Sequence, residues 1–316
     1  MLADNDLTYM QELATATIDD FVLPFRIEGA GFSGRLVRLG SAVDRALKAH
    51  DYPLPVSMLL GEALTLVALI GAGLKFEGTL TLQAQGDGPV SMLVADYCKP
   101  GLLRGYASFS LDAPAIAATK PVDGAKLLGG GHFALTIDPR TEDSMKRYQG
   151  IIPLENTNLA DCALSYFLRS EQIPTRIRTA VGPAYERNKD GLNWRAGGII
   201  VQRLAQEGGI KNLPSATEDD WSRVCYLLDT LEDHELLDPL LASERLLLRL
   251  FHEDGVRVFT QHDIAFGCQC NEERLQKVLT SFGRQDLQDL ALEGVISARC
   301  EFCNREYRFG LDDLLK

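Results

Sequence analysis

Four cysteines near the end of the chain constrain its fold more than any other feature of the sequence. They form two pairs, Cys268-Gln269-Cys270 and Cys300-Glu301-Phe302-Cys303, with residues 271–299 between them. Four thiolates that converge on one point make the soft, tetrahedral ligand set of a closed structural zinc site. A CxxC pair can also be a redox-active disulfide. The spacing therefore favours one four-thiolate zinc site, and a disulfide state stays open beside it.

The composition is that of a globular protein without a nucleic-acid-binding surface. Of its 316 residues, 46% are hydrophobic and 24% are charged, which gives enough apolar material for the core of one large domain or several ordinary domains. The net charge of −12 argues against a protein that binds a phosphate backbone, because that needs clustered lysine and arginine. Cys98, Cys162 and Cys225 are isolated in the sequence and are predicted to be buried small hydrophobes.

Neither a targeting signal nor a membrane span is predicted. Residues 1–20 carry acids and lack a basic segment followed by an apolar run. The longest apolar stretch, residues 58–74, is interrupted by Glu62 and is short for a span, so we expect it to be a helix inside a protein core. We therefore expect a cytoplasmic protein with no membrane partner, in a reducing compartment where free thiols and zinc are the usual states of cysteine.

The first 204 residues predict a mixed α/β domain. Period-two alternation predicts strands over 21–27 and 32–39, and Ser41 is expected to cap a helix over 42–50. Further strands are predicted at 78–85, 90–96, 133–137, 150–154, 175–181 and 198–204. A helix that Asn158 or Asn156 can cap is predicted over 159–167. The fold class that follows is α+β, with antiparallel sheets packed around buried helices over residues 1–204.

Residues 205–258 predict a helical linker. A polar segment that contains glycine and proline is followed by Thr217, a plausible cap for a helix that begins with three acids. Between residues 218 and 254 the chain carries eleven acidic side chains, three arginines and many leucines. An amphipathic, self-repelling helical segment needs a surface to lie on, although an ordinary solvated helix face would give the same pattern.

Residues 259–316 predict a small zinc-binding domain. At this size an apolar core alone is marginal, whereas structural zinc contributes about 10–16 kcal/mol. Asn271 is expected to cap a helix between the cysteine pairs, and residues 286–292 predict a second helical segment. We therefore expect this domain to unfold when its metal is removed.

Oxidation of the cysteines should have the same effect. If the neighbours within each pair formed disulfides, zinc would lose all of its ligands. One constraint over residues 271–299 would then be exchanged for two short loops, which restrict the unfolded chain little. Zinc keeps thiols deprotonated and hence reactive, and Arg299 and Arg305 flank the second pair and are expected to favour the thiolates further.

Five short motifs precede the cysteine pairs: His50-Asp-Tyr-Pro53, Leu74-Lys-Phe-Glu-Gly78, Gln85-Gly-Asp-Gly-Pro89, Arg147-Tyr-Gln-Gly150 and Tyr166-Phe-Leu-Arg-Ser-Glu-Gln-Ile-Pro-Thr175. Each is weakly specific alone. Jointly, in this order and over nearly the whole chain, they resemble the heat-shock protein 33 family of redox-regulated holdase chaperones.

The resemblance implies both the organisation and the mechanism of the protein. In the reduced, inactive form one Zn²⁺ is bound by Cys268, Cys270, Cys300 and Cys303. Oxidants form a Cys300–Cys303 disulfide first and a Cys268–Cys270 disulfide next, zinc leaves, and the metastable linker unfolds. The protein then forms a homodimer that holds unfolded or partly folded client proteins without ATP. Cys225, an extra thiol in the linker, departs from the family pattern and could form other disulfides.

Two other functions stay open from the sequence. A zinc-ribbon nucleic-acid-binding protein would explain the cysteines but not the net charge of −12. A thiol-disulfide oxidoreductase using Cys300 and Cys303 would be expected to place them at a helix N-terminus in a βαβ unit, which the pattern does not predict. The sequence shows no Ser/His/Asp set, no paired catalytic carboxylates and no metal-binding histidine motif, so we do not expect an enzyme.

Overall fold

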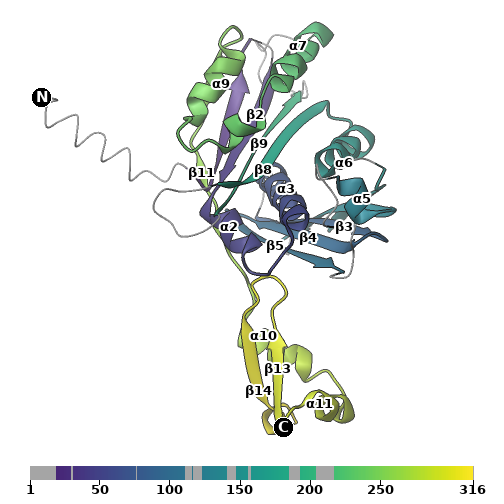
Figure 1. Ribbon diagram of the computed structural model, residues 1–316. Helices are drawn as coiled ribbons and strands as arrows, with labels where there is room; N and C mark the ends of the chain where they lie inside the picture. Colours follow the sequence, from purple (N-terminus) through teal and green to yellow (C-terminus); the bar gives the residue numbers. More distant parts are fainter. Residues whose placement is uncertain are drawn as a thin grey trace, which may run out of the picture.

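The computed structural model describes residues 19–29, 31–75, 77–110, 116, 123–140, 147–155, 158–184, 193–203 and 217–315. They form two six-stranded sheets with a long helix between them, further helices on the outer face of one sheet, and a small C-terminal lobe (Figure 1). The predicted α+β class is confirmed. The first part of the predicted linker, residues 205–216, and the alternative cap Asn156 lie outside the described residues.

The first sheet, sheet A, has the order β10-β1-β2-β9-β8, and β11 also pairs with β1. Its strands are β1 (Phe21–Ile27), β2 (Phe32–Leu39), β8 (Thr175–Ala184), β9 (Asn193–Arg203), β10 (Val256–Val258) and β11 (His262–Asp263). Side chains alternate between its faces, so Val37 and Leu39 join the core between the sheets, whereas Phe32 and Leu36 join a second core outside. Sheet A is therefore covered on both faces.

The second sheet, sheet B, has the order β12-β5-β4-β3-β6-β7. Its strands are β3 (Gly78–Gly86), β4 (Val90–Cys98), β5 (Leu102–Phe109), β6 (Gly131–Pro139), β7 (Tyr148–Pro153) and β12 (Ala265–Phe266). The predicted hairpin is confirmed as β3 and β4, joined through the turn at Asp87 and Gly88. Strand β12 pairs in parallel with β5, whereas the other strand pairs of both sheets are antiparallel.

Helix α3 (Leu54–Gly71) lies between the two sheets. It is long and apolar enough to cross a membrane by length and composition alone, but 78% of it is buried inside the protein. The prediction of a core helix is therefore confirmed. Helices α2 (Ser41–Leu47), α5 (Gly124–Leu128) and α6 (Leu159–Tyr166), with the π-helical turn η1 (Phe167–Glu171), contribute buried side chains to the same core.

The helix caps agree with the sequence in most places. Asn158 accepts a hydrogen bond from the backbone of Asp161 and caps α6, as predicted. The predicted Ser41 cap is wrong, because Ser41 is the first residue of α2 and makes no capping bond. Its role is taken by Asp20, whose Oδ1 accepts from the backbone N–H groups of Gly40 and Ala42 at 2.9 and 3.0 Å. A cap donated from another segment leaves no local sequence signal.

The linker helices lie on the outer face of sheet A (Figure 1). They are α7 (Glu218–Asp229), α8 (Asp233–Leu237) and α9 (Ser243–Phe251). Thr217 and Asp220 form a capping box at the start of α7, as expected for this cap. The leucine-rich faces join β1, β2 and β9 in one core: Phe21, Leu23, Phe25, Ile27, Phe32, Leu36, Ala180, Ile199, Val201, Val224, Leu228, Leu231, Leu236, Leu246, Leu247, Leu250 and Phe251.

A short segment, residues 256–266, connects the linker to the C-terminal lobe; we call it the strap. It contains β10 and β11, which pair with β1, and β12, which pairs with β5. The strap therefore joins the edge of sheet A to the edge of sheet B. Strands β11 and β12 belong to residues 259–316, the predicted zinc-binding domain, but they pair with strands of the N-terminal sheets. The domain boundaries stay predictions.

The C-terminal lobe contains α10 (Glu272–Leu279), α11 (Arg284–Leu290), β13 (Val295–Arg299), β14 (Glu306–Gly310) and α12 (Leu311–Leu314). Asn271 caps α10 as predicted, through its side chain and the backbone N–H of Arg274. The lobe has its own core, with these buried residues: Leu279, Leu287, Ile296, Tyr307, Phe309 and Leu314. So small a core agrees with the expectation that the lobe needs a further source of stability.

Candidate metal centre

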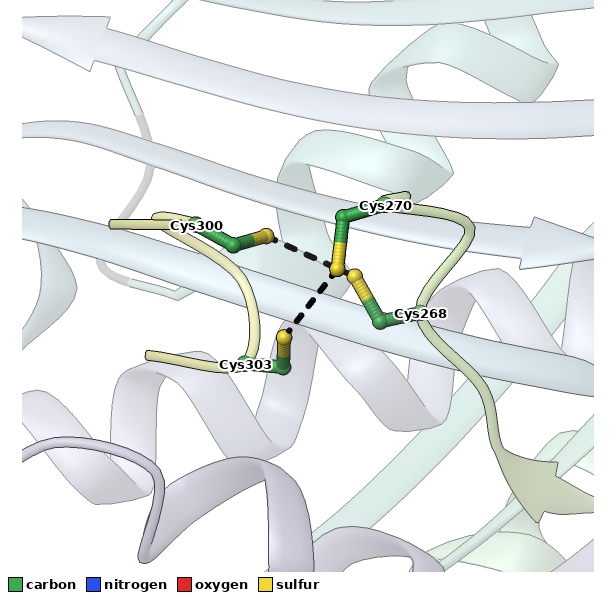
Figure 2. Close-up of side chains that lie close together, drawn as sticks. All are labelled: Cys268, Cys270, Cys300 and Cys303. Carbon is green, nitrogen blue, oxygen red and sulfur yellow. Dashed lines mark hydrogen bonds between the residues drawn. The ribbon is translucent and has the colours of Figure 1, made fainter. Parts of the chain in front are cut away.

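The four cysteines of the two pairs meet at one point (Figure 2). Cys268 and Cys270 follow β12, whereas Cys300 and Cys303 lie in the turn between β13 and β14. All four sulfur atoms lie within 4.8 Å of one another, and all four thiols are free. The sulfur atoms of Cys268 and Cys300 are 3.5 Å apart, and those of Cys270 and Cys303 are 3.4 Å apart. The site thus brings together residues that are 32 and 33 positions apart in the chain.

This arrangement fits a single tetrahedral metal ion. A Zn–S distance of about 2.3 Å implies sulfur atoms about 3.8 Å apart at the corners of a tetrahedron. The observed separations, from 3.4 Å up to a limit of 4.8 Å, bracket that value. Soft thiolate ligands in this geometry are typical of zinc. The four cysteines could therefore hold one ion.

The hairpin turn between β13 and β14 positions the second pair. The backbone N–H of Cys300 donates to the carbonyl of Arg305 at 3.0 Å, and the N–H of Asn304 donates to the carbonyl of Cys300 at 2.8 Å. Asn304 takes a left-handed backbone conformation, with φ of 57°, which asparagine tolerates better than most residues. Because Cys300 and Cys303 lie in a hairpin and not at a helix N-terminus, the setting expected of a thiol oxidoreductase is missing.

The thiols of the site affect each other's protonation. Burial alone would raise the pKa of Cys270, but hydrogen bonds from Tyr307 and the other cysteines lower this pKa to about 7. The hydroxyl of Tyr307 donates to the Cys270 sulfur at 3.2 Å. Burial and the neighbouring cysteines raise the pKa of Cys303 instead. Four negative thiolates are therefore unfavourable at this point without a bound cation.

Arg299 and Arg305, which were expected to favour the thiolates of the second cysteine pair, interact with other groups in the structure. The guanidinium of Arg305 lies over the ring of Tyr307, 5.5 Å from its centre. Burial raises the pKa of Cys303, and a hydrogen bond with the backbone of Arg305 only partly opposes this rise. The charge of Arg299 acts on Glu306, whose pKa it helps to lower. The expected effect of these two guanidinium groups on the thiolates stays a prediction.

An arginine of the N-terminal domain contacts the site, which the sequence did not indicate. Arg104 of β5 forms an ion pair with Asp96 at 2.7 Å, and its guanidinium lies 4.1 Å from the centre of the Phe302 ring. Burial lowers the pKa of Arg104, but Asp96 and Cys268 more than offset this and raise it. A cation close to Cys268 favours its thiolate, although burial raises the pKa of this thiol overall.

Two further contacts dock the site onto the N-terminal domain. The Nε2 atom of His50 lies 2.6 Å from the carbonyl oxygen of Glu301, so that this ring nitrogen is the donor. The side-chain amide of Gln269 donates to the sulfur of Cys98 at 3.3 Å. Both Glu301 and Gln269 lie between paired cysteines in the sequence. The metal site and its docking surface are therefore built from the same two loops.

The three remaining cysteines only partly follow the prediction. Cys98 and Cys162 are buried, with 5% and 1% of their surface exposed. Cys225 is partly exposed on α7, so the prediction of a buried residue is wrong there. Burial is nevertheless sufficient to raise the pKa of the Cys225 thiol. Among the described cysteines, the terminal four are the ones that converge.

Comparison with known proteins gives a consistent result over nearly the whole chain. The family model described as Hsp33 protein matches residues 20–310. The 33 kDa chaperonin of Caulobacter vibrioides (strain NA1000 / CB15N) is 45% identical over 297 residues, which are 93% of this chain and 96% of that protein. The 33 kDa chaperonin of Ectopseudomonas mendocina (strain ymp) is 36% identical over 299 residues, or 94% of each chain.

A solved structure supports the fold. The crystal structure of the 33 kDa chaperonin (heat shock protein 33 homolog) from Thermotoga maritima superposes with a TM-score of 0.77 and 24% identity. The match covers 94% of this chain and 97% of that chain. With the family model matching residues 20–310 and relatives at 36% and 45% identity, the chain belongs to the Hsp33 family of chaperones.

Proposed function

We propose that this protein is a redox-regulated, ATP-independent holdase with no catalytic turnover. In the reduced form one Zn²⁺, bound by Cys268, Cys270, Cys300 and Cys303, keeps it inactive. The observation that carries the proposal is the convergence of four free thiols within 4.8 Å in a lobe with a very small core. When bound, zinc supplies a cross-link and compensates the charge of the thiolates.

Oxidation removes this cross-link. Peroxide takes two electrons from each pair of thiols, a disulfide forms, and the two peroxide oxygens leave as two molecules of water. We propose that Cys300–Cys303 forms first and Cys268–Cys270 second. The closest sulfur contacts run between the pairs, from Cys268 to Cys300 and from Cys270 to Cys303. Peptide mapping of the oxidised protein by mass spectrometry therefore tests the pairing directly.

The strap offers a physical route from the metal site to the linker. Strand β12 ends at Phe266, two residues before Cys268, and β10 begins five residues after α9 ends at Phe251. The strap strands are only two or three residues long, so their pairing with β1 and β5 depends on anchors at both ends. Loss of the metal removes the C-terminal anchor, and the linker can then leave sheet A.

The surface uncovered in this way is apolar. Phe25 and Phe251 stack with their ring centres 5.9 Å apart, and Phe32 packs against Trp221 at 5.4 Å. Removing α7–α9 leaves the side chains of β1 and β2 without partners, and exposed apolar patches are typical of protein interaction sites. We propose that this face binds unfolded or partly folded clients and also supports a homodimer of the oxidised protein. A cytoplasmic location would keep the thiols reduced at rest, and neither nucleic acid nor a membrane is a proposed partner.

The experiment follows the light scattering of a heat-denatured client in the presence of the protein. The reduced, zinc-loaded protein should leave aggregation unchanged, whereas peroxide-treated protein should suppress it at stoichiometric concentration. A Cys225→Ser variant removes the partly exposed extra thiol, keeps the four clustered cysteines and should behave like the parent. Equal suppression by the reduced and oxidised proteins would contradict the proposed function.

A further inference from the structure

The four long strands of sheet A have an unusual charge pattern. Strands β1, β2, β8 and β9 contain no aspartate, glutamate or lysine, but they contain seven arginines. Five of these arginines reach the linker helices or their connections: Arg38, Arg176, Arg178, Arg195 and Arg203. The face beneath the linker is therefore apolar on β1 and β2, and lined with arginine from the end of β2 to β8.

Three of the arginines bind main-chain carbonyl groups of the linker. Arg38, only 2% exposed, donates from Nη1 to the carbonyls of Leu236 and Asp238 at 2.8 and 2.9 Å, and from Nη2 to that of Leu241 at 3.1 Å. Arg195 donates to the carbonyl of Leu237 at 2.7 Å. Arg178 donates to the carbonyl of Leu231 at 3.1 Å. Because all of these acceptors are main-chain carbonyls, the contacts do not depend on which side chains the linker carries.

Three contacts recognise acidic side chains. Arg176 pairs with Asp229, Arg178 lies 4.0 Å from Asp233, and Arg203 pairs with Glu218 at 2.7 Å. The linker supplies such groups in excess, because residues 218–254 hold eleven acids against three arginines. The acidic linker and the arginine-bearing sheet therefore match in charge as well as in apolar surface.

We propose that the face beneath the linker preferentially binds acidic, leucine-rich segments of unfolding proteins, and that the linker itself is a built-in surrogate for such a segment. The inference rests on the proposed function, in which the linker leaves this face on oxidation. Buried guanidinium groups would bind the backbone of any segment through its carbonyls. The half-exposed Arg176, Arg178 and Arg203 would then add a preference for carboxylates.

The test uses two fluorescent peptides and the oxidised full-length protein. One peptide carries leucines at helical spacing with glutamates between them, and its twin carries glutamines at the same positions. Anisotropy should show the acidic peptide binding about three- to tenfold more tightly at low salt, as expected for two or three partly exposed ion pairs. The difference should vanish at high salt, and the reduced zinc form should bind neither peptide.

Two double variants separate a binding role from a merely structural one. Arg176→Gln with Arg203→Gln removes two arginines that pair with linker carboxylates, so it should weaken binding of the acidic peptide to the oxidised protein and leave the twin unaffected. A structural role would instead only loosen the linker and raise binding of both peptides in the reduced state. The control, Arg169→Gln with Arg284→Gln, removes the same charge from exposed positions outside sheet A and should change neither affinity.

Two results would overturn the inference in distinguishable ways. Oxidant-dependent binding of both peptides with equal affinity would leave the proposed function intact and reject the preference for acidic segments. Failure of the oxidised protein to bind either peptide would contradict the proposed function itself, and the inference with it. Tighter binding of a single-stranded oligonucleotide than of the acidic peptide would reject a polypeptide as the partner.

Discussion

At the scale of single residues, Tyr307 is a hydrogen-bonding neighbour of Cys270, one of the candidate metal ligands. Its hydroxyl donates to the Cys270 sulfur, and this hydrogen bond, with burial, raises the pKa of Tyr307 to about 12. The phenol therefore remains a donor throughout the physiological pH range. Hydrogen bonds to ligand atoms fix their orientation and charge, and their loss typically weakens metal binding by about 10- to 100-fold.

Replacement of Tyr307 by phenylalanine should therefore raise the zinc dissociation constant about tenfold, while the ring stays in the core of the lobe. Competition with a chromophoric chelator measures the constant. Tyr226→Phe, at a position 73% exposed on α7, is the matched control and should leave zinc affinity unchanged. An unchanged constant in Tyr307→Phe would show that the hydrogen bond does not support the site.

Glu62 is a half-buried acid at the centre of α3. Burial raises its pKa from 4.5 to about 7, although the Glu62 carboxylate accepts a hydrogen bond from the backbone N–H of Ala160 at 2.9 Å. Below pH about 4.5 the carboxyl is protonated in both the folded and the unfolded chain. Between pH about 4.5 and 7 only the unfolded chain ionises, so the free energy of unfolding falls as the pH rises.

The variant Glu62→Gln should lack this dependence. We expect the parent to lose up to about 3 kcal/mol of unfolding free energy relative to the variant between pH 4.5 and 7, and no more above pH 7. Urea unfolding across this range measures the difference. Glu155→Gln, at a side chain 64% exposed, controls for removal of one charge. Parallel pH profiles for the parent and Glu62→Gln would contradict the account.

The candidate site could be predicted from the sequence only as far as its four cysteines. Their spacing predicts a four-thiolate ligand set, because soft ligands that converge on one point favour a metal such as zinc. Arg104, His50 and Tyr307 could not be found, since each reaches the site only through tertiary docking or hairpin pairing. Arg299 and Arg305 lie next to the second cysteine pair in the sequence, yet the guanidinium of Arg305 lies over the ring of Tyr307.

At the scale of elements, the linker is held by a few buried side chains. Helix α9 has its buried face on sheet A, where Phe251 is 0% exposed and stacks on Phe25. On the opposite face of the same helix, Leu248 is 55% exposed. The helix is thus amphipathic, and its docking depends on one face.

Truncation of Phe251 to alanine should destabilise docking of the linker by about 3–5 kcal/mol. The reduced, zinc-loaded variant should then suppress client aggregation without oxidant, and hydrogen exchange should show loss of protection in α7–α9. Leu248→Ala removes a leucine side chain from the exposed face and should leave both measurements unchanged. If the reduced Phe251→Ala variant did not suppress client aggregation, linker docking would not control activity.

Elements were predictable where local patterns are strong. Alternation predicted β1 and β2 with the bounds observed, and the apolar run predicted α3 to within a few residues. The strap could not be predicted, because strands of two or three residues carry no periodic signal and form only by pairing with existing sheet edges. The linker helices were predictable from their pattern, but the face that they cover was not.

At the scale of the whole molecule, the metal site and the linker core lie in different parts of the protein (Figure 1). The chain connects them through the strap, and the docking contacts of Arg104 and His50 hold the metal site against sheet B. In this account the zinc ion stabilises more than its own lobe, because the C-terminal anchor of the strap depends on it. The proposed sensing site and the proposed client-binding face are thus separated in space and linked by one segment.

The central claim is that oxidation of the four clustered thiols releases the metal. The most direct measurement follows zinc release with a chelator dye, and the oxidation state of each thiol by mass spectrometry, in a Cys225→Ser background treated with peroxide. We predict that one zinc ion leaves per chain as Cys268, Cys270, Cys300 and Cys303 are oxidised, while Cys98 and Cys162 stay reduced. Retention of zinc after oxidation of all four thiols would contradict the account.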